Sequence, residues 1–121
     1  MNVFDKILEA KENLNEVVLK TPLQFNINLS DKFKAEVYLK REDLQQVRSY
    51  KIRGAYNKMA TSSRVQLDKG IVCASAGNHA QGVALACHKL KVNGKIYMPE
   101  TTPQQKVGKA KRFGKEFVEI I

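Results

Sequence analysis

The chain of 121 residues carries 21 lysines and arginines against 12 aspartates and glutamates, a formal net charge of +9, and its hydrophobic share is 43%. That share is enough for a folded core and excludes wholesale disorder. No apolar run approaches the length of a membrane span, and the N-terminus lacks a basic-then-apolar signal pattern, so we expect a cytoplasmic protein without a membrane partner.

Hydrophobic periodicity and breaker residues divide the chain into short elements. Thr21-Pro22 ends the first helix, because the residue before a proline avoids the helical region. Asn93-Gly94 is expected to stop a later helix, and Thr102 is expected to cap the N-terminus of the last one. In chain order we expect a helix over 4–18, a helical turn near 29–33, a strand over 37–39, a helix from about 51 to 61, a polar connection over 62–70, a strand over 71–74, a turn over 75–78, a helix over 80–90, a strand over 95–98, a helix over 103–113 and a strand over 117–121.

The second half of the chain alternates strand, helix, strand, helix, strand. This order predicts right-handed βαβ units and a parallel sheet, which is an α/β fold. Parallel strands are normally buried on both faces. The last expected strand has no covering helix after it, so we expect the chain to be part of a larger domain.

The basic residues suggest a nucleic-acid partner at first sight. They cluster at Lys89, Lys91 and Lys95 and again from Lys106 to Lys115. Few aromatic residues are interleaved with them, and no nucleic-acid-binding signature accompanies them. A solvated basic face is the favoured interpretation, and nucleic acid is not an expected partner.

Lys51 is the first candidate for chemistry. Arg48 and Arg53 flank it, and it lies at or just before the start of a helix whose apolar face includes Ile52 and Met59. Neighbouring cations and the helix N-terminus both disfavour a protonated ammonium group. An unprotonated lysine is what Schiff-base chemistry needs. The alternative is an ordinary surface lysine at a helix end.

The stretch Ser75-Ala76-Gly77-Asn78-His79 is the second candidate. It lies between a strand end and a helix start, where open α/β sheets bind ligands. Small residues let a ligand approach the backbone, and free helix N–H groups suit an anion such as a carboxylate. Asn78 offers both a hydrogen-bond donor and an acceptor. Taken alone, the stretch also fits a plain helix cap after a glycine turn.

Two other interpretations are weaker. A metal site is not expected, because the cysteines and histidines show no CxxC or HxxxH spacing. Cys73 and Cys87 lie in apolar surroundings and are expected to be reduced. Glu42 and Asp43 could form an acid/base pair, but a structural or solvated role is favoured.

The two candidate stretches together resemble one family. Residues 49–55 resemble the Ser-x-Lys-x-Arg-Gly-Ala signature of the threonine/serine dehydratases, with Tyr50 where Phe is more usual, and residues 75–82 resemble the asparagine loop of the same family. These are pyridoxal-phosphate (PLP) enzymes of fold type II, the tryptophan-synthase-β-like fold, and the resemblance is closest to the biosynthetic threonine dehydratases, or threonine ammonia-lyases. Further matches in the expected order are Thr21-Pro22-Leu23, Lys40-Arg41-Glu42-Asp43-Leu44, Met98-Pro99 and Lys106-Val107.

The resemblance implies a role for each matched residue. Lys51 would carry PLP and act as the base at the substrate Cα, and Asn78 would hydrogen-bond the 3-oxygen of the pyridine ring. The backbone around Ser75, Gly77 and His79, next to Asn78, would hold the substrate carboxylate. The substrate would be L-threonine, with L-serine as a second one, and the products 2-oxobutanoate and ammonia in isoleucine biosynthesis.

The resemblance also implies an incomplete enzyme. The family holds the PLP phosphate with a glycine-rich loop that this sequence lacks, so the chain resembles an N-terminal portion and is not expected to work as a dehydratase alone. Residues 1–47 would form an N-terminal helix, an arm and the first strand of a large domain, and residues 48–121 part of the small PLP domain. The intact protein would be a homo-oligomer. The competing hypothesis is a non-catalytic α/β module that binds an anionic ligand, a partner chain or nucleic acid.

Overall fold

The computed structural model describes residues 2–121. Its helices are α1 (Val3–Asn13), α2 (Ile27–Phe33), α3 (Lys51–Ala60), α4 (Arg64–Leu67), α5 (Asn78–Leu90) and α6 (Gln104–Gly114), with 3-10 turns η1 (Glu42–Leu44) and η2 (Lys115–Phe117). Its strands are β1 (Leu23–Phe25), β2 (Tyr38–Lys40), β3 (Ile71–Ala74), β4 (Gly94–Tyr97) and β5 (Val118–Ile120).

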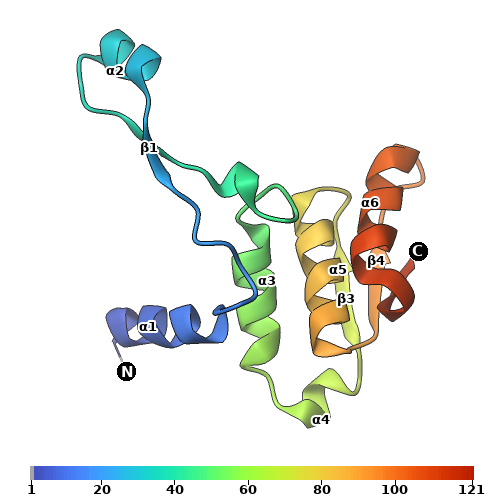
Figure 1. The fold of residues 1–121 in the computed structure, drawn as a ribbon. Coiled ribbons are helices and arrows are strands. Elements are labelled where there is room, and N and C mark those ends of the chain that lie inside the picture. The colour runs from blue at the N-terminus through green and yellow to red at the C-terminus, as the bar shows by residue number, and fades with distance from the viewer. Residues whose placement is uncertain (1) are drawn as a thin grey trace.

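A three-stranded parallel sheet in the order β3-β4-β5 forms the centre of the body. Helices α5 and α6 cover one face of this sheet, and α3 packs along α5 (Figure 1). This arrangement confirms the predicted α/β fold built of βαβ units. The predicted positions of the three strands and of the two helices between them agree with the structure to within a few residues.

The two faces of the parallel sheet differ in burial. On β4, Gly94 and Ile96 are buried beneath the helices, whereas Lys95 and Tyr97 are exposed. A Cβ atom added at Gly94 would lie 2.7 Å from the Cys87 sulfur of α5, so glycine lets this helix approach the sheet closely. The opposite face is open, and the ion pair between Lys95 and Glu119 lies on it with an N–O distance of 3.4 Å.

Helix α5 is the most buried element of the body. Every residue from Ala80 to Cys87 is buried, because α3, α6 and the sheet surround the helix. The predicted stop at Asn93-Gly94 is wrong. Lys91 caps the helix in the left-handed conformation, with φ of 54°, and Gly94 already belongs to β4.

The N-terminal part of the chain differs most from the prediction. Helix α1 ends at Asn13, before the left-handed Glu16 with φ of 63°, and does not continue to Val18. Strand β1 was not expected, and it pairs with β2 as an antiparallel ribbon. Helix α2 lies at the tip of this ribbon, which projects from the body (Figure 1). We call residues 21–41 the arm. Its large apolar side chains are mostly exposed: Leu23, Phe25, Ile27, Phe33, Tyr38 and Leu39.

Two caps also differ from the prediction. A capping box of Ser63 and Gln66 starts the short helix α4 inside the stretch expected to be a polar connection. Pro103, not Thr102, is the N-cap of α6, and the Thr102 hydroxyl is buried without a hydrogen bond to any residue of 2–121. None of the described helices is both long and apolar enough to cross a membrane.

Ile96 on the central strand gives a direct test of this packing. Its side chain is fully buried, so Ile96→Ala should lower the free energy of unfolding by about 2–5 kcal/mol through lost contacts and a residual cavity. Val72→Ala is the matched control, because Val72 lies on the open face of the same sheet with 69% exposure. Urea denaturation of both variants measures the difference, and equal losses would contradict the assignment of the two faces.

Candidate functional site

Lys51 is the first residue of α3, as the sequence predicted. Tyr50 occupies the N-cap position without a side-chain cap, and the Lys51 backbone N–H donates to the Ser49 hydroxyl at 3.4 Å. A tight turn precedes this start, because Arg48 is left-handed, with φ of 60°. Behind the start of the helix, Ile52 is buried in the core.

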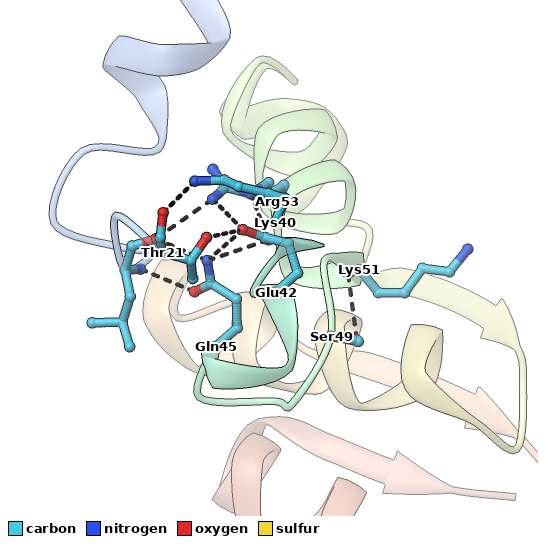
Figure 2. A network of polar contacts seen from close by, with 8 residues as sticks. Thr21, Lys40, Glu42, Gln45, Ser49, Lys51 and Arg53 are labelled. Carbon is cyan, nitrogen blue, oxygen red and sulfur yellow. Dashed lines mark hydrogen bonds and ion pairs between the residues drawn. The ribbon is translucent and has the colours of Figure 1, made fainter. Parts of the chain in front are cut away.

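The Lys51 side chain is half-buried and extends toward the outside. Its ammonium nitrogen lies 5.2 Å from the centroid of the Tyr50 ring. Figure 2 shows it pointing away from the polar side chains that surround Arg53. The amine is therefore free to meet a ligand at this end of α3.

The second predicted stretch forms the turn between β3 and α5. Gly77 is the N-cap residue of α5. Because glycine has no side chain, the N-cap offers no side-chain acceptor to the first N–H groups of the helix. The Ser75 N–H donates to the Tyr97 carbonyl at 3.0 Å, and the Gly77 N–H donates to the Ser75 hydroxyl at 3.3 Å. Asn78 and His79, the first two residues of α5, are exposed.

A shallow hollow lies beside this turn, at the carboxyl ends of β3 and β4. It is lined by Ala74, Ser75, Ala76, Tyr97, Met98 and Pro99. A Cβ atom at Gly77 would meet nothing within 4 Å, so the space next to the turn is open. The His79 side chain faces a different groove, which Cys73 and Val83 also line.

Close packing of α5 on α3 brings the two predicted stretches together. A Cβ atom at Gly82 would lie 3.0 Å from the Lys51 carbonyl carbon and 3.2 Å from the Ile52 nitrogen, so a side chain there would require this backbone to shift by a few tenths of an ångström. Asn78 precedes Gly82 by four residues and lies on the same face of α5, one turn nearer its N-terminus. Both helices start at the same end of the body (Figure 1). Lys51 and Asn78 therefore stand at neighbouring helix starts.

A cluster of polar side chains lies on the other side of the α3 start. The carboxylate of Glu42 accepts two hydrogen bonds from Arg53, each of 2.7 Å, and one of 2.5 Å from the Thr21 hydroxyl (Figure 2). The Gln45 side chain exchanges two hydrogen bonds of 2.9 Å with the Leu19 backbone and contacts Glu42. We call these five residues, Leu19, Thr21, Glu42, Gln45 and Arg53, the Glu42 cluster.

The Glu42 cluster corrects one premise of the sequence analysis. The sequence predicts Arg53 as a cation that acts on Lys51, but its guanidinium group is paired with Glu42. Arg53, with the Thr21 hydroxyl, lowers the pKa of Glu42 to about 2 although burial opposes the ionised form. Glu42 therefore has the structural role that the sequence favoured, and exposed Asp43 pairs with Arg41 at 2.7 Å.

The cysteines and histidines do not gather into a metal site. No group of three or more His, Cys, Asp or Glu side chains suited to a metal occurs within residues 2–121. Cys73 and Cys87 are both free thiols. Burial raises the pKa of Cys87 to about 11, so this thiol is a poor nucleophile.

Comparison with protein families decides the affiliation. The sequence profile of a family described as pyridoxal-phosphate dependent enzyme matches residues 14–120. The chain belongs to this family. The cofactor of the family is PLP, and the α/β fold described above is fold type II of the PLP enzymes.

Individual relatives share this fold. The chain is 57% identical over 115 residues to the biosynthetic L-threonine dehydratase IlvA of Bacillus subtilis. The aligned region covers 95% of this chain and 27% of that protein. Among solved structures, processed threonine deaminase isoform 2 of Solanum lycopersicum is 44% identical, with a TM-score of 0.84 over 98% of this chain and 34% of that one. Maize serine racemase is 32% identical, with a TM-score of 0.88 over 97% of this chain and 35% of that one. The chain thus spans about a quarter to a third of the length of these relatives.

The residues present fit the family cofactor. Lys51 carries an outward-facing primary amine, the type of group that forms an imine with an aldehyde such as that of PLP. An exposed amide at Asn78 and open space next to Gly77 lie at the neighbouring helix start.

The close approach at Gly82 yields a testable prediction. In Gly82→Ala the new methyl group would press on backbone atoms of Lys51, which cannot rotate away. Gly108→Ala in α6 is the matched control, because a Cβ there meets nothing within 4 Å and alanine favours a helix. Chemical denaturation should show Gly82→Ala to be less stable than Gly108→Ala by about 1–3 kcal/mol. Equal stability would refute the tight contact.

The pKa of Glu42 predicts a loss of stability in acid. Its folded pKa, about 2, lies below the ordinary value of 4.5, so the stabilisation is complete above about pH 4.5 and is lost as pH falls toward 2. At about 1.4 kcal/mol per pKa unit, the fall in pKa from 4.5 to about 2 corresponds to a total loss of roughly 3 kcal/mol. Denaturation of the native chain and of Glu42→Gln between pH 5 and pH 2 measures this. The prediction fails if Glu42→Gln loses as much stability over this range as the native chain.

Proposed function

We propose that residues 1–121 form the lysine-bearing part of a PLP-dependent L-threonine dehydratase, a threonine ammonia-lyase that also accepts L-serine. The observation that carries the proposal is the meeting of Lys51 and the Ser75–Asn78 turn at neighbouring helix starts, in a chain 57% identical to a biosynthetic threonine dehydratase. The product would be 2-oxobutanoate, a precursor in isoleucine biosynthesis.

In this proposal Lys51 has two roles. Its amine would hold PLP, and the same amine would remove the proton from the substrate Cα once the substrate is bound. Bound PLP supplies the electron sink for the charge that develops at Cα. Loss of that proton and of the β-hydroxyl removes one water, and release of ammonia takes one water up, so L-threonine gives 2-oxobutanoate and ammonia.

The turn before α5 binds and orients. Asn78 would hydrogen-bond the 3-oxygen substituent on the pyridine ring of PLP, and because an amide does not titrate in this range it would act by orientation and not as an acid or base. The backbone around Ser75, Gly77 and His79 would hold the substrate carboxylate. The Ser75 and Gly77 N–H groups already have acceptors within the chain, so the N–H groups of the first turn of α5 would donate to it. The hollow beside Tyr97 and Pro99 leaves room for the substrate.

The same proposal assigns the parts of the chain. Residues 1–47 belong to a large domain, to which they contribute an N-terminal helix, an arm and a first strand, and residues 48–121 form part of the small domain. The exposed apolar side chains of α1 and of the arm support this division, because such a surface is normally covered. We further propose a cytoplasmic homo-oligomer for the intact enzyme.

A chimera tests the function without assumptions about the length of the natural protein. Residues 1–121 replace the matching segment of the Bacillus subtilis threonine dehydratase, and 2-oxobutanoate is assayed with PLP and L-threonine. The chimera should turn over, because every proposed role is filled, whereas Lys51→Ala should abolish turnover without unfolding the protein. Lys58→Ala, an exposed lysine of the same helix, is the control and should keep full activity.

The same assay on the 121-residue chain completes the test. We expect no steady turnover, because positioning of cofactor and substrate supplies much of the barrier lowering and this chain offers only the groups around Lys51 and Asn78. Near-normal turnover by the Lys51→Ala chimera would disprove the role of Lys51. An inactive but folded chimera would disprove the proposed function.

A further inference from the structure

Arg53 and Glu42 form a partly buried ion pair with two hydrogen bonds, unlike an ordinary surface ion pair. Its Nε donates to one carboxylate oxygen and its Nη2 to the other, both at 2.7 Å, and Nη2 also approaches the Leu19 carbonyl at 3.5 Å. The Glu42 side chain is only 14% exposed. A bidentate, partly buried pair of this kind fixes direction as well as distance.

The pair holds the first turn of α3. Arg53 lies two residues after Lys51, and at 3.6 residues per turn their side chains leave the helix about 200° apart. Figure 2 shows the result, with Arg53 inside the Glu42 cluster and Lys51 extending away from it. Arg53 therefore cannot act on a ligand at Lys51 directly, and it can act only through the backbone of the turn.

The other residues of the Glu42 cluster connect the first turn of α3 to earlier parts of the chain. Glu42 and Gln45 come from η1 and its C-cap, whereas Leu19 and Thr21 lie in the segment before β1. Lys40 Nζ also donates to the Thr21 carbonyl. Two earlier segments of the chain are thereby joined to the first turn of α3, while Gly82 of α5 packs on the Lys51 backbone from another element.

We propose that Arg53 and Glu42 are positioning residues that fix the direction of the Lys51 amine by holding the first turn of α3 against the Glu42 cluster. The inference rests on the proposed role of Lys51 as the PLP-bearing residue. The alternative, in which Arg53 binds an anionic group of cofactor or substrate, does not fit, because Glu42 already occupies Nε and Nη2.

The experiment uses the full-length chimera with Glu42→Gln, Arg53→Lys and the double variant. Arg53→Lys keeps the charge but loses the planar two-point contact. Asp43→Asn is the matched control, because the Arg41–Asp43 pair has the same 2.7 Å distance next to the cluster but side-chain exposures of 33% and 57%. Three quantities are measured at a temperature where every variant is folded: the rate at which the visible absorbance of lysine-bound PLP develops in the apoprotein, kcat, and KM for L-threonine.

If the pair positions Lys51, both single variants should slow PLP attachment and lower kcat by about tenfold or more, because small misplacements of a reacting group are costly. KM should stay within about twofold of the parent, since the turn before α5 is untouched. The double variant should be no worse than the more impaired single variant, because the two residues act as one unit. Asp43→Asn should match the parent.

Two results would overturn the inference. In the first, Glu42→Gln melts earlier but keeps the parent attachment rate and kcat, which would make the pair purely structural. In the second, Arg53→Lys behaves as the parent, which would show that charge without two-point geometry suffices. If the unsubstituted chimera does not turn over L-threonine, the proposed function fails, and the attachment rates still decide whether the pair positions Lys51.

Discussion

Two hydrogen bonds of 2.7 Å join the guanidinium group of Arg53 to the carboxylate of Glu42, and the start of α3 depends on them. A carboxylate with little solvent contact needs such partners, and Thr21 and Gln45 supply further ones. On the side of α5, the absence of a side chain at Gly82 lets this helix contact the backbone of Lys51 and Ile52 at the start of α3. One charged pair and one glycine thus set where Lys51 stands, although neither is part of the proposed chemistry.

This arrangement places reactive and binding groups at one edge of the body. The starts of α3 and α5 lie at the same end, and the turn between β3 and α5 follows the carboxyl end of its strand (Figure 1). Ligands of open α/β sheets bind at this edge, where helix N–H groups favour anions. The chain contributes an amine, an amide and free N–H donors there, which matches what a PLP enzyme needs to hold its cofactor ring and an amino-acid carboxylate.

Sequence reasoning succeeded where the determinants are local. The βαβ alternation after Gly70 could be predicted because short apolar strands and amphipathic helices alternate with clear breakers, and the helix at Lys51 was found from its apolar face. Prediction from the sequence failed where contacts between residues far apart in the chain determine the structure. Strand β1 has only three residues, all exposed, and exists through its pairing with β2. In the Glu42 cluster, Arg53 contacts residues 11 and 34 positions earlier in the chain, so no local pattern in the sequence could reveal that its charge is paired.

The most direct test of the account is to find which lysine takes up PLP. The chimera is loaded with PLP, reduced with borohydride and digested, and the labelled peptides are identified by mass spectrometry. The account predicts one dominant label, on the peptide that contains Lys51, and its loss in Lys51→Ala without transfer to Lys58 or another lysine. A label spread over several surface lysines, or a dominant label elsewhere in the chimera, would contradict it.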